Sequence, residues 1–204
     1  MAKRDILNLF NLVHGQINRL RYVYRFSGTN VLHRENVAEH SFYTAFYSLV
    51  IGTNYVSHHV NLGKLVQKAL LHDVEEQFTG DIIRPIKYLT PNVTQEIESA
   101  AGQMVFNLFE LICPVPRYCF ELWRDAKDKT MEGKIVRFAD FISVLSSLNQ
   151  EIESGNNAVM SSVHGLPEYC KSFDTPEFDF LNSYRDQAQK IVEDLEHSRR
   201  KSYE

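Results

Sequence analysis

The sequence predicts an all-α fold, and three observations lead to this class. Apolar residues recur at helical spacing along most of the chain. The alternation of apolar and polar residues that marks a strand is missing, and clusters of turn-forming residues separate the apolar stretches. With 204 residues, of which 44% are hydrophobic and 24% charged, the chain is long enough to bury a sizeable core. We expect one domain over residues 1–204, a helical bundle of roughly seven to nine helices.

The positions of individual helices are predicted from apolar stripes and from one helix N-cap. An amphipathic helix opens the chain, because apolar residues from Ile6 to Leu20 lie three or four positions apart. Asn36, with Glu39 three positions later, resembles a capping box, so a second helix begins there. The clearest stripe runs from Ile97 to Phe109. Breaks between helices are expected at Ser27-Gly28, Thr79-Gly80, Thr90-Pro91, Cys113-Pro114-Val115-Pro116, Ser154-Gly155-Asn156-Asn157 and Asp174-Thr175-Pro176.

The C-terminal part is expected to combine a loop with a helix. Residues 155–178 are rich in glycine, asparagine, serine, proline and aspartate, which favours a long loop. A final helix over about residues 178–198 follows it. No internal repeat or low-complexity run indicates a second domain.

The charge and the cysteine content exclude several classes of protein. With 22 Lys+Arg against 26 Asp+Glu, the net charge is −4, so no chain-wide positive field attracts nucleic acid or an anionic membrane. No apolar stretch approaches the roughly 18 residues of a membrane helix, and no targeting segment is recognised. The three cysteines, Cys113, Cys119 and Cys170, form no CxxC pair, which favours a reducing compartment. We expect a cytoplasmic protein whose partner is a small molecule.

An adjacent pair, His72-Asp73, lies at the polar end of an apolar helical run. Neighbouring helix positions diverge by about 100°, so one cation can contact both side chains only from between them, and its other ligands must come from different helices. His40 is one candidate, because the positive end of the helix dipole favours a neutral imidazole that can donate a lone pair. A lone histidine in such a place is more often a core or surface residue.

Asp140 interrupts an apolar stretch, residues 135–142, that should be buried. A buried carboxylate without a partner of opposite charge costs several kcal/mol. One possible partner is Arg137, three residues earlier on the same helix face, and taken alone this ion pair is the simpler interpretation. The other is a metal ion shared with the two histidines and Asp73.

Two imidazoles and two carboxylates form a mixed ligand set that suits one divalent ion, Mn, Fe, Co, Ni or Zn. Such an ion lowers the pKa of coordinated water and draws charge from a phosphoryl oxygen, so the ligand set predicts hydrolysis. Glu76, on the helix face of His72 and Asp73, could move a proton, or it could be a solvated surface glutamate. Asp81 could either cap the next segment or face the same water.

The order and spacing of His40, His72-Asp73 and Asp140 resemble the H…HD…D pattern of the HD-domain phosphohydrolases. The HD pair alone is a weak motif, but the resemblance extends along most of the chain to the bacterial YfbR-type 5′-deoxynucleotidases. The segments that carry it are Glu35-Asn36-Val37-Ala38-Glu39-His40-Ser41, His72-Asp73 with Glu76, Thr79-Gly80-Asp81, Pro85-Ile86-Lys87-Tyr88, Ala139-Asp140 and Gly155-Asn156-Asn157.

This resemblance implies a single HD domain whose metal site is built from about residues 36–140. It implies a homo-oligomer, a dimer or higher. It also implies roles for named residues: metal ligation by His40, His72, Asp73 and Asp140, with catalytic and water-positioning duties on Glu76 and Asp81.

A second family feature is an Arg-aromatic pair before the first metal histidine, which here falls on Arg25-Phe26. An arginine offers a planar fork to a phosphate, and an aromatic side chain offers a wall to a sugar or base. The family pattern has tryptophan where this chain has Phe26, so the preference for base or sugar is open. The basic and aromatic stretch 19–26 is alternatively an RNA-binding patch. Lys87 adds positive charge near a phosphate, or is a plain surface lysine.

The leading hypothesis is a metal-dependent phosphohydrolase that releases phosphate from deoxynucleoside 5′-monophosphates. The nearest alternative is a dNTP triphosphohydrolase, for example one acting on dATP, because small phage-encoded HD enzymes that resemble this family use similar ligands. A longer polyphosphate needs more positive charge around the pocket. A second alternative is a nucleotide-binding HD module without turnover. The basic residues whose presence at the pocket would favour a triphosphate are Arg19, Arg21, Arg34, Arg84 and Lys87.

Overall fold

The structure is a computed structural model, which describes residues 12–87 and 89–201. Six helices of nine or more residues form the framework of this described part: α2 (Val37–Thr53), α3 (Leu62–Leu71), α6 (Pro91–Ile112), α7 (Pro116–Arg124), α8 (Met131–Glu153) and α11 (Asn182–Lys201). Shorter helices join them: α4 (Glu76–Thr79), α5 (Arg84–Lys87), α9 (Met160–Val163) and α10 (Leu166–Lys171). The described residues also form four 3₁₀ helices: η1 (Gln16–Tyr22), η2 (Val56–His58), η3 (Asn157–Val159) and η4 (Pro176–Leu181).

The predicted all-α class is confirmed. The described residues contain no strand, and their single β-bridge joins Tyr24 to Asn36. The capping box is confirmed too: Asn36 Oδ1 accepts from the Glu39 amide, and Glu39 Oε2 accepts from the Asn36 amide. The apolar stripe from Ile97 to Phe109 lies within α6, as expected. None of the described helices is both long and apolar enough to cross a membrane.

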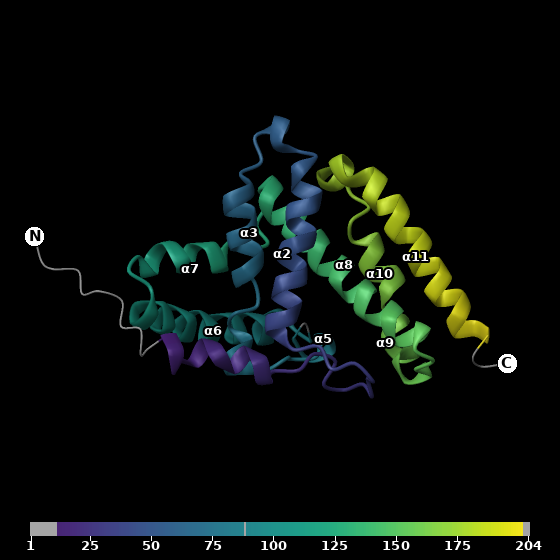
Figure 1. The fold of residues 1–204 in the computed structure, drawn as a ribbon, viewed down its shortest axis with the longest axis horizontal. Helices are drawn as coiled ribbons and strands as arrows, with labels where there is room; N and C mark the ends of the chain where they lie inside the picture. Colours follow the sequence, from purple (N-terminus) through teal and green to yellow (C-terminus); the bar gives the residue numbers. More distant parts are fainter. Residues whose placement is uncertain (1–11, 88, 202–204) are drawn as a thin grey trace, which may run out of the picture.

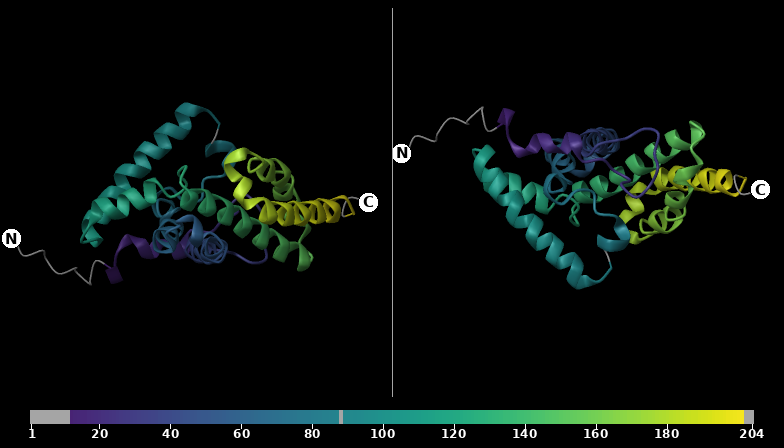
Figure 2. Two further views of the ribbon diagram at one scale, coloured as in Figure 1. Left: turned by 90° about the horizontal axis from the view of Figure 1, so that it is seen from above. Right: turned by 90° about the horizontal axis from the view of Figure 1, so that it is seen from below.

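Helix α8 lies at the centre of the fold (Figure 1). It packs against α2 and α3 on one side and against α11 on another, while α6 and α7 form a separate pair. Seen from above and from below, α6 and α11 lie toward opposite ends of the molecule (Figure 2). The pair α6 and α7 at one end and α11 at the other therefore meet the central helices α3 and α8 in the middle of the bundle.

Two apolar clusters hold this arrangement together. The larger one surrounds α8, where Phe138 and Phe141 are fully buried and pack with Phe173 from the C-terminal region. The smaller cluster joins α6 to the start of α2, with Val37 and Phe109 among its members. Burying a large apolar side chain contributes about 1.5–3 kcal/mol, so these clusters fix the relative positions of the helices.

Two expectations for the ends of the chain need correction. In the opening stripe, Ile6 and Phe10 lie outside the described residues, whereas Ile17 and Leu20 lie in the 3₁₀ helix η1 rather than in an α-helix. Their three-residue spacing matches the three-residue turn of a 3₁₀ helix, which places both on one side. The final helix, expected over about 178–198, is present as α11 and begins four residues later.

Residues 155–178 are not the expected long loop, because η3, α9 and α10 occupy much of the segment. Val159, Val163 and Leu166 are buried in the larger apolar cluster, and a proline in the first turn of α10 is compatible with a helix start. The polar composition of the segment hid an apolar stripe of helical spacing. Burial of this stripe against α8 and α11 overrides the weak local preference for a loop.

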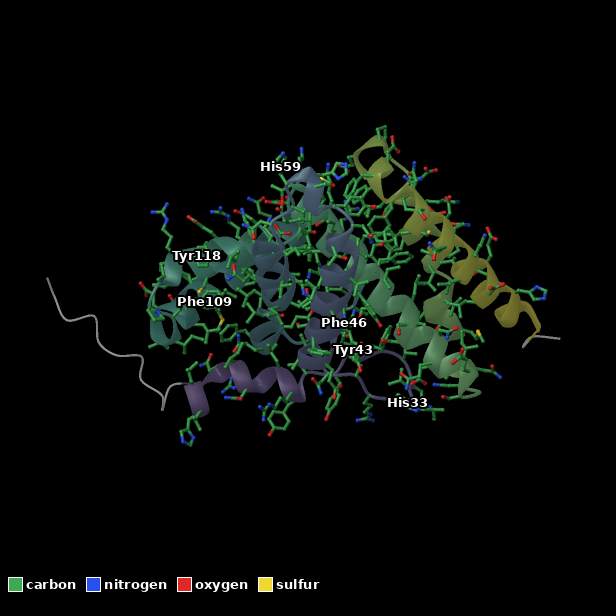
Figure 3. All side chains as sticks on the ribbon, turned by 45° about the horizontal axis from the view of Figure 1, so that its top comes forward. His33, Tyr43, Phe46, His59, Phe109 and Tyr118 are labelled. Atoms are coloured by element: carbon green, nitrogen blue, oxygen red, sulfur yellow. The ribbon has the colours of Figure 1, made fainter. Side chains whose placement is uncertain are left out.

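The outer face of α2 carries several large apolar side chains. Tyr43 and Phe46 are labelled on it in Figure 3, and their exposed fractions are 47% and 51%. Phe42, one turn before Phe46, is exposed to 59%. Aromatic residues in this number on one exposed helix face are unusual for an isolated soluble surface.

Candidate active site

The four predicted metal ligands come together at the centre of the bundle. His40 lies in the first turn of α2, which the capping box fixes. His72 and Asp73 directly follow α3, and Asp140 lies in the middle of α8. All four residues are buried, and donor atoms of His40, His72 and Asp140 lie within 4.8 Å of one another. Three separate helices thus supply one cluster.

The spacing of the donor atoms suits a bound ion. Nε2 of His40 lies 3.2 Å from Nε2 of His72, 3.4 Å from Oδ2 of Asp73 and 3.2 Å from Oδ1 of Asp140. Nε2 of His72 lies 2.9 Å from Oδ2 of Asp73. Metal–ligand bonds of about 2.0–2.2 Å place adjacent ligands of an octahedron roughly 3 Å apart. The residues therefore fit a divalent ion without rearrangement of the helices.

Hydrogen bonds orient both imidazole rings. Nδ1 of His72 lies 2.7 Å from the carbonyl oxygen of Ala69. A carbonyl oxygen can only accept a hydrogen bond, so Nδ1 carries the proton and the ring presents the lone pair of Nε2 to the cluster. Nδ1 of His40 lies 3.1 Å from Oγ of Ser143 on α8. The carbonyl fixes the tautomer and the direction of the His72 ring, and the hydroxyl of Ser143 holds the direction of the His40 ring. Burial lowers the pKa of His72, which further favours its neutral form.

Lys127 is the principal cation at this cluster. Its Nζ lies 2.6 Å from Oδ2 of Asp140 and 3.7 Å from Oδ1 of Asp73. Burial alone raises the pKa of Asp140, but Lys127 and the histidines outweigh burial and hold that pKa well below its usual range. The pKa of Asp73 is also well below its usual range, because His72 and Lys127 outweigh its burial. Both carboxylates are therefore charged and able to bind a cation.

The ion pair between Asp140 and Arg137, the simpler interpretation from spacing, is not what the described residues form. Asp140 pairs with Lys127, thirteen residues earlier. The guanidinium of Arg137 lies 5.4 Å from the ring centroids of both Phe173 and Phe178. Arg137 therefore covers aromatic rings of the core, and the carboxylate of Asp140 is left for the cluster.

Glu76 and Asp81 lie beside the cluster and line one cavity with Asp73 and Asp140. Oε2 of Glu76 is buried and has no hydrogen-bond partner within the described part of the chain. Burial and the neighbouring charge of Asp73 raise the pKa of Glu76 to about 9. A carboxyl group in this state carries a proton at neutral pH, as a general acid does. Glu76 is thus not the solvated surface residue that its sequence also allowed.

Arg25 and Phe26 line the same cavity. Arg25 pairs with Glu35 at 3.4 Å and contacts Nδ1 of His40. Its guanidinium carbon lies 5.6 Å from the ring centroid of Phe26. Phe26 has a φ of 56°, in the left-handed region that bulky residues rarely adopt. Strained backbone of this kind is found most often at functional sites.

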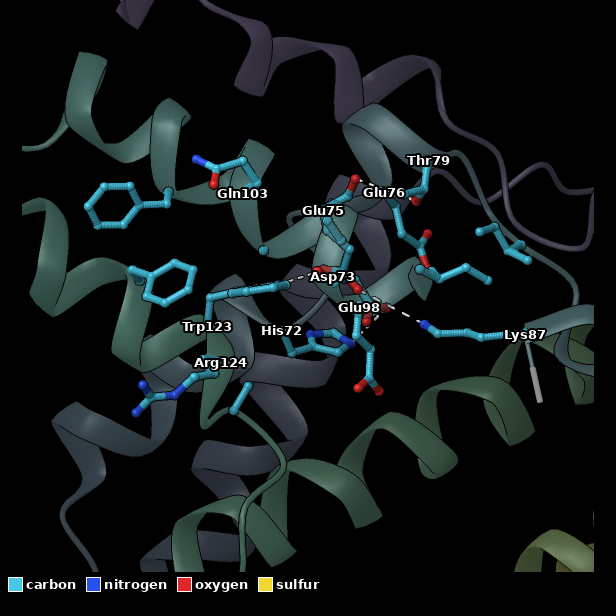
Figure 4. A pocket seen from close by; sticks show the side chains of 18 of the residues that line it. His72, Asp73, Glu75, Glu76, Thr79, Lys87, Glu98, Gln103, Trp123 and Arg124 are labelled. Carbon is cyan, nitrogen blue, oxygen red and sulfur yellow. Dashed lines mark hydrogen bonds and ion pairs between the residues drawn. The ribbon is translucent and has the colours of Figure 1, made fainter. Parts of the chain in front are cut away.

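Two cavities, each of about 730 Å³, meet at the cluster. The first extends toward α8, α9 and α10, where Phe26 and Tyr169 contribute to its wall. The second extends toward α6 and α7, and in it Trp123 and Lys87 approach Glu75 from two sides (Figure 4). The residues that line both cavities are Asp73, Glu76, Ile82, Lys87 and Lys127.

Sequence reasoning missed Lys127 and the pair of Glu75 and Trp123. Nε1 of Trp123 donates to Oε2 of Glu75 at 2.7 Å. Burial and the charge of Asp73 raise the pKa of Glu75 to about 7. Lys127 lies in a short polar turn between two helices, where charged residues are common and carry no signal of their own. A role for Lys127 becomes visible only when the fold places its ammonium beside Asp140.

Comparison with known proteins identifies the family of this chain. The sequence profile of the family described as 5′-deoxynucleotidase YfbR-like matches residues 13–194. The chain belongs to the YfbR-like family. A 5′-deoxynucleotidase of Pasteurella multocida is 31% identical over 172 residues, which cover 81% of this chain and 87% of that protein. A 5′-deoxynucleotidase of Vibrio vulnificus is 28% identical over 173 residues, covering 81% and 88%.

Solved structures share the fold of this YfbR-like protein. An HD-domain phosphohydrolase of Listeria innocua superimposes with a TM-score of 0.63 at 22% identity, covering 92% of this chain and 98% of that one. A Pyrococcus horikoshii protein superimposes with a TM-score of 0.66 at 20% identity, covering 91% and 99%. At this identity, the likeness supports the HD-type helical bundle and not a particular substrate.

Proposed function

We propose that this protein is a metal-dependent phosphohydrolase that releases phosphate from deoxynucleoside 5′-monophosphates. The observation that carries the proposal is the convergence of His40, His72, Asp73 and Asp140 beside Arg25. The family relationship supports the deoxynucleotide as substrate, because the curated relatives are 5′-deoxynucleotidases. We propose the four residues as ligands of one divalent ion, with Co, Mn, Zn, Ni and Fe as the candidate metals.

The residues of the chain divide the work of hydrolysis. When bound, a divalent ion lowers the pKa of a coordinated water and withdraws charge from the phosphoryl group. Arg25 holds a phosphate oxygen through its planar fork. As the bond from phosphorus to the sugar oxygen breaks, the carboxyl of Glu76 would supply a proton to that oxygen, while Asp81 would orient the attacking water and accept the proton that this water loses. Phe26 provides an apolar wall for the deoxynucleoside, and Lys87 adds positive charge at the cavity junction.

A substrate screen tests this function. Metal-stripped protein reconstituted with Co²⁺ or Mn²⁺ is expected to release phosphate from dAMP, dGMP, dCMP or TMP. The matched control is Asp140→Asn, which keeps the size of the side chain and removes a ligating charge. Absence of phosphate release from all four nucleotides would contradict the proposal. Tight binding of intact nucleotide by the metal-loaded protein would instead favour a nucleotide-binding module.

A dNTP triphosphohydrolase is the second candidate, and one observation favours it. Lys87 lines both cavities, so a phosphate chain could extend from the cluster into the cavity beside α6 and α7. Arg19, Arg21 and Arg34 are not among the lining residues of either cavity, and the side chain of Arg84 lies outside the described part. Chromatography of a dATP reaction distinguishes the two activities, because only the second releases intact triphosphate.

We also propose that the chain is one HD domain that works as a cytoplasmic homodimer. The family resemblance supports dimerisation, and the exposed face of α2 with Phe42, Phe46 and Val50 is the surface we assign to it. Phe46→Glu is expected to yield a monomer in light scattering. Ile191→Glu on α11, at a residue exposed to 42%, is the matched control and should leave the mass unchanged. Free thiols on all three cysteines agree with a reducing compartment.

A further inference from the structure

Lys127 occupies an unusual position for a lysine in a surface turn. It lies between α7 and α8, yet its ammonium pairs with Asp140 at 2.6 Å and lies 3.7 Å from Asp73, two of the proposed metal ligands. Its side chain is exposed to 34%, so it is accessible from outside the protein. It also lines both cavities, at the point where they meet. A ligand that reaches the cluster from either cavity passes this ammonium group.

The backbone that carries Lys127 is held by an ion pair between the buried Lys68 and the partly exposed Asp128. Nζ of Lys68, a fully buried residue of α3, lies 2.8 Å from Oδ2 of Asp128 and donates to Thr130 Oγ1 at 3.2 Å. Asp128 Oδ1 accepts from the Thr130 amide at 3.0 Å. At Gly133, an added Cβ would lie 2.5 Å from the carbonyl oxygen of Asp128, so only glycine lets this turn lie so close to α8. The turn is therefore rigid next to the flexible side chain of Lys127.

Lys127 faces Oδ2 of Asp140 and Oδ1 of Asp73, while the other oxygen of each carboxylate faces the histidines. The ammonium and a bound divalent ion would thus share both carboxylates, and their positive charges would oppose each other there. An ion bound by Asp73 and Asp140 neutralises the charge that holds Lys127 in place, which weakens its ion pairs. The four-carbon side chain can then turn by rotation of its own bonds while the turn stays fixed. A phosphate dianion beside the ion requires positive charge, and Lys127 is close enough to provide it together with Arg25.

We propose that Lys127 is a substrate-binding residue that pairs with the ligand carboxylates in the absence of metal and binds the substrate phosphate once metal is present. This role depends on the proposed phosphohydrolase function for its substrate. Its first half, the competition with metal, depends only on the cluster. The two halves can therefore be measured separately.

The experiment compares Lys127→Met with Lys129→Met. Lys129 lies in the same turn, is exposed and lines neither cavity, so it controls for a change of charge in this region. Titration calorimetry with Co²⁺ alone is expected to show several-fold tighter binding for Lys127→Met than for wild type. With dAMP as substrate, the KM of Lys127→Met is expected to be about tenfold higher than that of wild type, which is the typical effect of losing one charged hydrogen bond. The affinity of the Co²⁺-loaded protein for inorganic phosphate should fall in parallel.

A conservative variant and two contrary results complete the test. Lys127→Arg is expected to restore most of the phosphate affinity, because it keeps a cation at this position. The proposal would be overturned if Lys127→Met bound Co²⁺ and phosphate with the same affinities as Lys129→Met. A rise in KM with weaker Co²⁺ binding would also overturn it, since Lys127 would then support the ligands rather than compete for them. If wild type hydrolyses no nucleotide, the proposed function fails, while the Co²⁺ and phosphate titrations still decide the role of Lys127.

Discussion

Two buried carboxylates on α8, Asp140 and Glu151, lie about three helical turns apart and have different kinds of partner. Glu151 accepts from the backbone amides of Leu32 and His33 at 2.8 and 2.6 Å, and from the side chain of Asn156. Asp140 is paired with side chains only, the ammonium of Lys127 and the ring of His40. Both residues are buried, with exposed fractions of 8% and 3% for Asp140 and Glu151.

The difference separates a proposed ligand site from a structural anchor. Backbone amides cannot leave Glu151 without unfolding the segment around residues 32–33, so this carboxylate connects the loop that follows Phe26 to the end of α8. The side chain of Lys127 can turn away from Asp140 by rotation of its own bonds, so this carboxylate can exchange the ammonium for a bound ion. Burial and charge are similar at the two positions, and the nature of the donors distinguishes their roles.

The largest expected effect is at Asp140. Asp140→Asn removes a ligating charge, and the loss of several kcal/mol of transition-state stabilisation predicts a fall in kcat of about a thousandfold. In thermal unfolding, Co²⁺ at about a hundredfold excess over its Kd stabilises the wild type by about 2.7 kcal/mol. That stabilisation should be greatly reduced in Asp140→Asn and retained in Glu151→Gln. Equal stabilisation of the two variants by Co²⁺ would remove the proposed distinction.

A smaller effect is expected at Ser143, which contacts His40 from α8 one turn after Asp140. Ser143→Ala removes one of the two partners of His40 Nδ1, the other being Arg25, and loss of such a contact typically costs about 10- to 100-fold in metal affinity. Calorimetric titration with Co²⁺ measures this change. Ser146→Ala, also on α8 but paired with Tyr47 outside the cluster, is the control. A Co²⁺ affinity equal to that of the control would mean that the contact does not orient the ring.

Glu151→Gln is expected to act on stability. A neutral amide leaves donors of the loop and of Asn156 poorly paired, which predicts a loss of about 1–3 kcal/mol in the free energy of unfolding. Urea unfolding measures this loss. Glu153→Gln, two residues later and exposed, should change the stability by less than about 0.5 kcal/mol. A stability of Glu151→Gln within the range of this control would show that Glu151 is no anchor.

The smallest effect is the pH dependence of the Glu151 contribution. Burial alone raises the pKa of Glu151, but the donors from Asn156, Leu32 and His33 outweigh it, so the pKa lies below its ordinary value of 4.5. The stabilisation by the carboxylate is therefore full above pH 4.5 and is lost as the pH falls below it. The stability difference between wild type and Glu151→Gln should shrink over that range. A difference that grows on acidification would reverse the assigned sign.

Much of the fold, and the grouping of the four proposed ligands, could be predicted from the sequence. The apolar stripe of α6 and the capping box at Asn36 are local patterns, and local patterns determine where helices begin and lie. The cluster depended on the order of His40, His72-Asp73 and Asp140, which the family resemblance made specific. The helical segment within 155–178 was missed because its apolar residues lie among polar ones, and burial against α8 decided its structure.

The partners of the cluster could not be predicted in the same way. Lys127 and Arg137 both lie within thirteen residues of Asp140, and spacing along one helix favoured Arg137. In the structure Asp140 pairs with Lys127, because the turn between α7 and α8 brings this lysine to the cluster. The position of the turn depends on the ion pair between Asp128 and Lys68, which is distant in the sequence. Contacts between residues that are far apart in the sequence leave no local pattern.

The left-handed backbone of Phe26 makes this position suited to engineering the sugar preference of the enzyme. The conformational cost of a positive φ, about 1–3 kcal/mol, applies similarly to Phe, Trp and Tyr, because all three carry the same Cβ. A series of aromatic residues at position 26 therefore varies ring size and polarity at nearly constant backbone energy. Differences in discrimination between ribonucleotides and deoxyribonucleotides across such a series can be attributed to the ring itself, whereas glycine would relax the backbone as well.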